Sequence, residues 1–142
     1  MKSTNKIEFN QLFIGFEFPP QSYTFDSSMV SIYLEAVKES NDLYLSKDLV
    51  PPMLVTAYAM AALSEAISMP PGTIHVTQEL NFQSLVKVGD TITCCSTVSR
   101  KVDRGSLHIM SVDIVVSNQN KIKVLTGKVG FILPDPVAGQ SP

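Results

Sequence analysis

The sequence LVPPMLVTAYAMAALS, residues 49–64, contains no charged residue and carries the pair Pro51-Pro52 near its start. Proline is tolerated in the first turn of a helix, where its missing N–H would have no partner, so the pair marks a helix start. We predict a helix over residues 52–68, ended by the sequence MPPG at residues 69–72. Because this helix has no polar face, we expect it to be buried nearly all round.

The residues that follow the apolar helix alternate between apolar and polar in the manner of strands. The predicted strands cover residues 74–82, 91–101, 107–117 and 122–133, and turns at residues 88–90, 103–105 and 118–120 separate them. In the first strand, one face is predicted to hold Ile74, Val76, Leu80 and Phe82, with His75 on the opposite, polar face. This run indicates an antiparallel sheet.

Before the apolar helix, the sequence predicts a short extended segment over residues 13–18, which Pro19-Pro20 ends. Asp26, Ser27 or Ser28 can then cap an amphipathic helix that extends to Val37. Its predicted apolar positions are Met29, Val30, Ile32, Tyr33, Ala36 and Val37. Residues 43–50 read as a loop.

Together these elements predict an α+β fold in which a strongly curved antiparallel sheet wraps one apolar helix. We expect a single domain over residues 1–134 and a disordered tail over residues 135–142. A sheet this small with apolar residues on both faces needs cover, and we expect a homodimer in which two sheets join edge to edge.

The composition excludes several classes of partner. Eleven basic and thirteen acidic residues give a net charge of −2, which offers no attraction for nucleic acid or an anionic membrane. The uncharged run is shorter than the roughly 20 residues that cross a bilayer. The N-terminal residues do not lead into an apolar signal core, so we expect a cytoplasmic protein.

The two cysteines, Cys94 and Cys95, are adjacent on a predicted strand. Neighbouring side chains on a strand point to opposite faces, so these two are badly placed to bridge each other. No further metal ligands cluster near them, and we therefore expect reduced structural thiols and no metal site.

Three segments of the chain are similar to one known family. They are residues 32–42 (IYLEAVKESND), the helix entry at residues 50–54 (VPPML), and residues 81–92 (NFQSLVKVGDTI), which resemble the family pattern F-x-x-P-V-x-x-G-D. The chain resembles the hot-dog fold and, within it, the MaoC-like dehydratases and hydratases. The resemblance is nearest to the N-terminal modules of fatty-acid-synthase-type (3R)-hydroxyacyl dehydratases, and it covers about residues 10–133.

The resemblance implies a role in fatty acid metabolism, on an acyl thioester of coenzyme A or of acyl carrier protein. The substrate then brings its own coenzyme A or phosphopantetheine, and no separate cofactor is expected. The resemblance also implies a homodimer, or a heterodimer with another hot-dog subunit. We expect a (3R)-hydroxyacyl thioester dehydratase (an enoyl hydratase) or a component of one.

Catalytic members of the family carry an Asp and a His in a pattern like D-x-N-P-x-H after the first helix. Dehydration of a 3-hydroxyacyl thioester needs a base at the α-carbon and an acid for the departing hydroxyl. Laid on this pattern, Asn41 matches, Glu39 replaces the Asp and Tyr44 replaces the His. These three are the candidate catalytic residues, although tyrosine is a poor base near neutral pH. The alternative is a solvated Glu39 and a Tyr44 that packs the loop onto the sheet; Asp42 is a further candidate acid.

Family members hold the thioester carbonyl with N–H groups at the start of the buried helix, where the dipole favours negative charge. Here the donors would come from Met53 and Leu54, because Pro51 and Pro52 have no N–H. Tyr58 and His75 complete the expected substrate-binding residues, although His75 can equally be a solvent-facing edge histidine.

Two other functions stay open. The missing histidine suits a non-catalytic subunit that holds the acyl chain for a catalytic partner. A hot-dog thioesterase is also possible, with Glu65 on the buried helix as the candidate base, but the chain lacks the D-x-x-G-H-x-N-N signature of one large thioesterase group. Arg100, Lys101 and Arg104 can attract the phosphates of coenzyme A, or can simply form a solvated face.

Overall fold

The computed structural model describes residues 6–41, 44 and 46–135 of the chain. Its main feature is a five-stranded sheet in the order β2-β7-β8-β9-β5, with every neighbouring pair antiparallel. The strands are β2 (Gln21–Thr24), β5 (Ile74–Phe82), β7 (Thr91–Arg104), β8 (Leu107–Ser117) and β9 (Lys123–Pro134). The four strands predicted after the apolar helix are confirmed, while β2 was not predicted as a strand.

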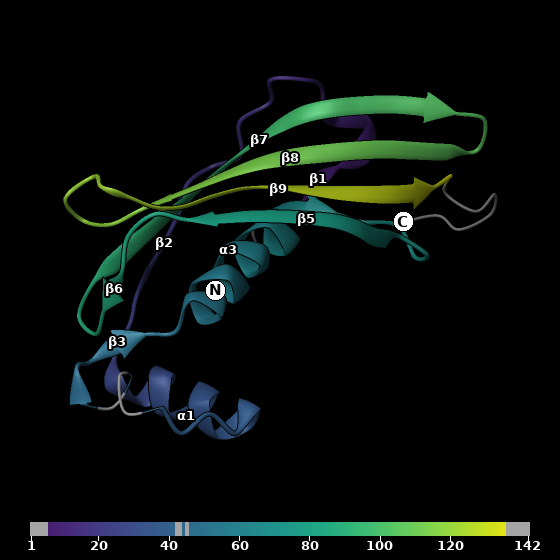
Figure 1. Ribbon diagram of the computed structural model, residues 1–142. Coiled ribbons are helices and arrows are strands. Elements are labelled where there is room, and N and C mark those ends of the chain that lie inside the picture. Colours follow the sequence, from purple (N-terminus) through teal and green to yellow (C-terminus); the bar gives the residue numbers. More distant parts are fainter. Residues whose placement is uncertain (1–5, 42–43, 45, 136–142) are drawn as a thin grey trace.

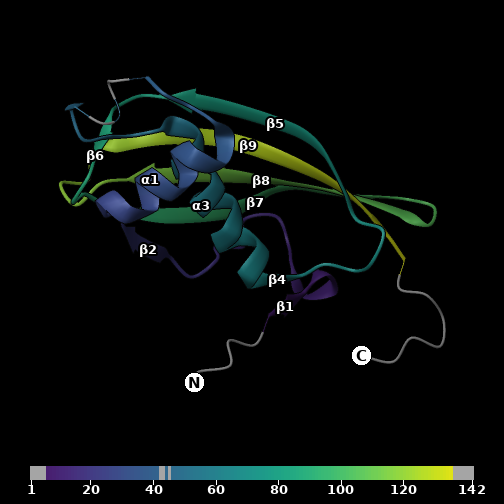
Figure 2. The same ribbon diagram turned by 90° about the horizontal axis from the view of Figure 1, so that it is seen from below.

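The central helix α3 (Pro52–Ala66) lies under the concave face of this sheet (Figures 1 and 2). It begins at the predicted proline and ends two residues early, because β4 (Ile67–Ser68) pairs in parallel with β1 (Ile7–Glu8). A curved antiparallel sheet around one helix is the hot-dog fold, and the predicted α+β class is confirmed.

The core forms where α3 meets the inner face of the sheet. The buried residues of the helix are Leu54, Val55, Thr56, Ala59, Ala62 and Leu63. Facing them, β8 buries Met110, Val112, Ile114 and Val116, as the alternation predicted. The expectation that α3 is buried nearly all round is wrong for the single chain. Met53, Ala57, Ala61 and Ser64, spaced at three or four residues, form an exposed stripe.

The first helix, α1 (Ser27–Val37), is capped by Asp26, whose carboxylate accepts a hydrogen bond from the Met29 N–H at 2.8 Å. The predicted helix is confirmed, but its buried face is narrower than expected. Only Val30 and Leu34 are buried, and Ile32 is exposed. Val30 and Leu34 are four residues apart, so they lie one helical turn from each other on the same face of α1.

Short elements complete the fold. The 3-10 helix η1 (Phe9–Gln11) follows β1, and β3 (Leu49–Val50) pairs with β6 (Val86–Lys87) in a separate two-stranded sheet. Residues 13–18, predicted as extended, instead turn at Gly15, whose φ of +93° suits glycine. After the turn, the segment runs along β7: Glu17 forms an isolated bridge with Thr97, and the Phe18 N–H donates to the Ser96 carbonyl oxygen at 2.9 Å.

A bulge at Val76 changes which faces the side chains of β5 occupy. Beyond the bulge, Leu80 and Phe82 pair with residues on the inner side of β9, and before it His75 does so too. Ile74 therefore lies on the opposite face. The predicted grouping of Ile74 with Leu80 and Phe82 is wrong, because a one-residue insertion reverses the alternation.

Candidate functional site: the start of the buried helix

The first turn of α3 was expected to present two N–H groups, and the structure leaves one of them available. The Leu54 N–H donates to the Pro51 carbonyl oxygen at 3.0 Å, and the Val55 N–H lies 3.3 Å from the same oxygen. Among the described residues, no acceptor is recorded for the Met53 N–H. Pro52 has no N–H. Met53 is therefore the single backbone donor at the positive end of the helix dipole.

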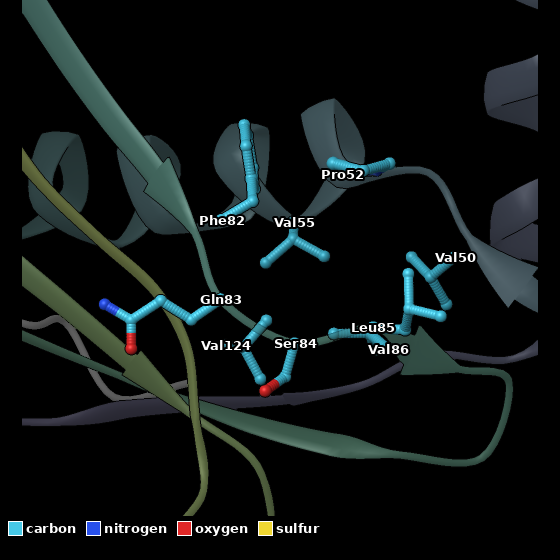
Figure 3. A pocket seen from close by; sticks show the side chains of 9 residues that line it. All are labelled: Val50, Pro52, Val55, Phe82, Gln83, Ser84, Leu85, Val86 and Val124. Atoms are coloured by element: carbon cyan, nitrogen blue, oxygen red, sulfur yellow. The ribbon is translucent and has the colours of Figure 1, made fainter.

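An apolar pocket of about 240 Å³ opens beside this first turn. Pro52 and Val55 of α3 form part of its wall, and Figure 3 shows Val55 pointing from the helix into it. The remaining lining residues are Val50, Phe82, Gln83, Ser84, Leu85, Val86 and Val124. No charged side chain lines the pocket, so it suits an apolar ligand group.

The loop after α1 places Glu39 in a structural role. Lys38 ends α1 in the left-handed conformation, and the Glu39 N–H donates to the Leu34 carbonyl oxygen at 2.9 Å. The Glu39 carboxylate then accepts a hydrogen bond from the Asn41 N–H at 2.9 Å. Glu39 is exposed and caps its own loop. Asp42, the further candidate acid, lies outside the described residues.

Tyr44, the residue in the position of the family histidine, is half-buried and packs against the hydrophobic core. Its backbone N–H lies 3.3 Å from the Asn41 carbonyl oxygen. Within the described part of the chain, no hydrogen bond joins the Tyr44 hydroxyl to the Glu39 carboxylate. The loop therefore brings the candidate catalytic residues into one segment, without a hydrogen bond between the Glu39 and Tyr44 side chains in the described part of the chain.

Tyr58 packs away from the pocket, against β2 and the residue that follows it. Its ring lies 4.9 Å from that of Tyr23 and 5.3 Å, edge to face, from that of Phe25. The Tyr23 hydroxyl is buried, with no hydrogen-bond partner among the described residues. Burial raises the pKa of Tyr23, and the nearby Glu65 carboxylate raises it further. Glu65 itself is exposed.

His75 lies at the far end of β5 from the pocket. Phe82 lies seven positions further along the chain, a span of about 23 Å along a strand. Its ring lies 4.9 Å from that of Phe131, and its Nε2 atom is 3.0 Å from the Thr77 carbonyl oxygen. In the single chain, His75 and Tyr58 are thus separate from the pocket that Pro52 and Val55 help to line.

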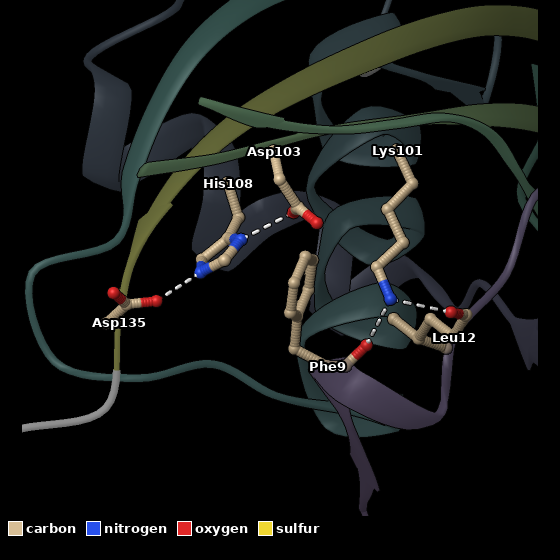
Figure 4. A network of polar contacts seen from close by, with 6 residues as sticks. All are labelled: Phe9, Leu12, Lys101, Asp103, His108 and Asp135. Atoms are coloured by element: carbon tan, nitrogen blue, oxygen red, sulfur yellow. Dashed lines mark hydrogen bonds and ion pairs between the residues drawn. The ribbon is translucent and has the colours of Figure 1, made fainter. Parts of the chain in front are cut away.

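A network of polar side chains lies on the β7–β8 hairpin, apart from the pocket (Figure 4). His108 Nδ1 is 2.6 Å from the Asp103 carboxylate, and His108 Nε2 contacts the Asp135 carboxylate. These two hydrogen bonds, that of Asp103 first, raise the pKa of His108. The His108 ring also lies 5.3 Å from that of Phe9. Asp135, placed in the predicted tail, is thereby held to the fold; residues 136–142 lie outside the described part.

Lys101, one of three basic residues considered for phosphate binding, is committed to the N-terminal segment. Its Nζ atom donates to the carbonyl oxygens of Phe9 and Leu12 at 3.2 and 2.8 Å. It also lies 4.5 Å from the centre of the Phe9 ring. Arg100 and Arg104 are exposed.

Comparison with protein-family models shows which family the chain belongs to. The model of the family described as "FAS1-like, dehydratase domain region" matches residues 12–126. The chain belongs to this family. A comparison with curated protein sequences finds no match.

Solved structures of MaoC-like dehydratases and (R)-hydratases share the fold of this family member. The R-hydratase PhaJ1 from Pseudomonas aeruginosa is 20% identical with a TM-score of 0.78, covering 96% of this chain and 95% of its own. The (R)-hydratase from A. caviae involved in PHA biosynthesis is 21% identical, with a TM-score of 0.73 and coverages of 87% and 98%.

A third similar structure comes from a complex of two different subunits. The C-terminally truncated HadBC (3R)-hydroxyacyl-ACP dehydratase from Mycobacterium tuberculosis is 16% identical with a TM-score of 0.69. The match covers 84% of this chain and 96% of that one.

Sequence reasoning found the helix start but not the pocket. The β5–β6 connection, residues 83–85, contributes to the pocket wall and lies within the quoted family segment over residues 81–92. That likeness was the signal that could have found it. Across the described residues, no helix is long and apolar enough to span a membrane. The same residues contain no group of three or more His, Cys, Asp or Glu placed to hold a metal ion.

Proposed function

We propose that this chain is the acyl-binding component of a (3R)-hydroxyacyl thioester dehydratase, acting on thioesters of coenzyme A or acyl carrier protein. The observation that carries the proposal is the apolar pocket beside the first turn of α3, whose Met53 N–H has no acceptor among the described residues. The thioester carbonyl accepts a hydrogen bond from Met53, and the acyl chain enters the pocket. Negative charge that develops on the carbonyl oxygen is stabilised by the helix dipole.

The reaction removes a proton from the α-carbon and a hydroxyl from the β-carbon, which leave as water. It needs a base and an acid that reach the same substrate. Here the Glu39 carboxylate accepts a hydrogen bond from its own loop, and Tyr44 packs against the core. These placements favour a catalytic pair supplied by a partner subunit. The second candidate is a complete hydratase in which Glu39, Asn41 and Tyr44 act within this chain.

The catalytic partner in this proposal is a different hot-dog subunit, because a second copy of this chain would bring the same Glu39 and Tyr44. Among the strands of the described residues, β5 lies at the edge of the sheet, with β9 as its only neighbour. Its apolar residues Ile74, Val76 and Phe82 are exposed, and so is the Met53 to Ser64 stripe of α3. An exposed strand edge beside an apolar helix stripe is a surface that association would cover. HadBC, a dehydratase of similar fold, is such a complex of two subunits.

The chemistry requires no cofactor beyond the thioester carrier that the substrate brings. We place the component in the cytoplasm.

Hydration of crotonyl-CoA, the reverse reaction, tests the proposal. The purified chain alone is expected to leave the enoyl absorbance unchanged, whereas the complex purified from its native cells through the tagged chain is expected to hydrate the substrate. The Val55→Phe variant in the same complex should still hydrate crotonyl-CoA, whose short chain fits the reduced pocket, and should lose most of its activity on 2-decenoyl-CoA, because the larger ring takes up part of the pocket.

Two results would overturn the proposal. A complex that does not hydrate crotonyl-CoA would contradict the proposed dehydratase function. Hydration by the chain alone, lost in Glu39→Gln and Tyr44→Phe, would show instead that the chain is a complete enzyme.

A further inference from the structure

The pocket beside α3 has a closed floor of four valines. Val50 and Val86 face each other as a pair across β3 and β6, Val55 comes from the helix, and Val124 comes from the start of β9. Each is only 1–3% exposed. Because four separate elements supply these side chains, the floor is fixed by the packing of the whole core.

The rim of the pocket is different in character. Phe82 and Leu85 are 43% and 68% exposed. Phe82 is the last residue of β5, and Leu85 lies in the connection just before β6. Between them, the Gln83 side-chain amide donates to the Thr126 hydroxyl at 3.0 Å, which holds its polar group away from the pocket. An apolar chain can therefore enter past Phe82 and Leu85 and must stop at the valines.

The volume of the pocket limits how much chain it accepts. An apolar cavity of about 150 Å³ is known to hold benzene, roughly 25 Å³ for each carbon. At that ratio, the 240 Å³ of this pocket holds at most about ten carbons.

We infer that the four-valine floor selects short and medium straight acyl chains, with an upper limit of about ten carbons. This inference rests on the proposed function and adds its substrate class. Chains of twelve or more carbons must leave their ends in water, and they gain no further affinity from those carbons.

Calorimetric titration of the purified chain with coenzyme A and with butyryl-, octanoyl-, dodecanoyl- and palmitoyl-CoA, below their micelle concentrations, tests the limit. From four to eight carbons the affinity should rise by up to about fourfold for each methylene. From twelve to sixteen carbons it should stay level.

Variants of the floor and the rim separate the two parts of the pocket. Val55→Phe should lower the limit by about two carbons, and Val55→Leu provides a smaller step in case the larger side chain prevents folding. Leu85→Ala, the matched rim variant, should weaken all chain lengths alike and leave the limit unchanged.

The outcomes distinguish this inference from the proposed function. Affinity that keeps rising to palmitoyl-CoA, or a limit that does not move in either Val55 variant, would overturn the inference alone. Acyl thioesters that bind no better than coenzyme A itself would overturn the proposed function as well.

Discussion

Single residues decide what the start of α3 can do. Pro51 and Pro52 set the helix start but offer no N–H, and the Pro51 carbonyl takes up the Leu54 N–H. Met53 is left as one donor where sequence reasoning expected two. One donor can matter at such a site, since the loss of a single oxyanion-hole donor, a side-chain amide, costs about 10²–10³ in rate in a well-studied protease. The remaining chemistry must come from side chains.

The two cysteines are predicted to differ sharply in reactivity. Cys94 is buried, and burial followed by the neighbouring Cys95 raises its pKa to about 12, while Cys95 is exposed. Since the thiolate is the reactive form, a thiol reagent such as DTNB at pH 8 should modify one cysteine in the folded protein and both in urea. The Cys95→Ser variant should show no reaction until it unfolds. Rapid labelling of Cys94 in that variant would contradict the described burial.

The His108 network predicts a pH dependence of stability. Hydrogen bonds to Asp103 and Asp135 raise the pKa of His108 in the folded state, so the charged ring is favoured by folding. This contribution is fully present below the unfolded pKa of about 6.5 and is lost as pH rises through the folded value. His108→Gln should therefore lower the urea midpoint at pH 5.5 and change it less at pH 9.

The control for His108 is His75→Gln, because the His75 ring contacts the Thr77 carbonyl oxygen and not a carboxylate. An equal loss of stability at both pH values in His108→Gln would show that the ring acts through packing against Phe9 alone.

At the scale of elements, alternation and helix signals predicted much of the fold. The proline pair located α3, and the alternating residues Met110, Val112, Ile114 and Val116 of β8 are buried. The Val76 bulge could not be predicted, because an inserted residue leaves the composition of a strand unchanged. β2 was missed because four residues, QSYT, are too short to show alternation.

The candidate site was predicted less completely than the fold. The helix start was found because proline has a local structural meaning. The pocket was not, since Phe82, Leu85 and Val124 come together only through tertiary packing. The placement of Glu39 depended on a left-handed Lys38, and non-glycine residues adopt that conformation too rarely to expect it.

The pairing of β5 with β9 depends on two glycines, which gives a further prediction. A Cβ atom at Gly127 would lie 2.6 Å from the Glu79 carbonyl oxygen, whereas one at Gly130 would lie 2.2 Å from the Thr77 hydroxyl. Gly127→Ala should destabilise the protein by about 1–3 kcal/mol, because the backbone cannot move aside. Gly130→Ala should cost less, since the threonine can rotate.

Urea unfolding of the single and double variants checks this pairing. Thr77→Ala should recover the stability of Gly130→Ala but not that of Gly127→Ala. Recovery of both, or of neither, would show that the two contacts are not as described.

At the scale of the whole molecule, the single chain leaves the edge of β5 and the stripe of α3 uncovered. The prediction that α3 is buried all round was wrong for this reason. Its apolar sequence includes surface residues that a second subunit would bury. We predict that the purified chain forms at least a dimer. Ala57→Glu places a charge in the exposed stripe and should shift it to a monomer with unchanged helix content.

Light scattering after size exclusion measures this shift. Asn120→Glu, which adds the same charge at the exposed β8–β9 turn, is the matched control and should remain associated. A wild-type chain that is monomeric at 100 μM or more (on the order of a weak interface) would contradict the proposed surface.

The central claim is that an acyl thioester binds where the first turn of α3 meets its apolar pocket. Amide NMR of the ¹⁵N-labelled chain during titration with octanoyl-CoA, with coenzyme A as the reference, tests it most directly. The acyl-dependent shifts should be largest at Met53, Val55, Ser84 and Leu85, with Asp103 and His108 unchanged. Shifts that concentrate on the β7–β8 hairpin, or that coenzyme A alone reproduces, would contradict it.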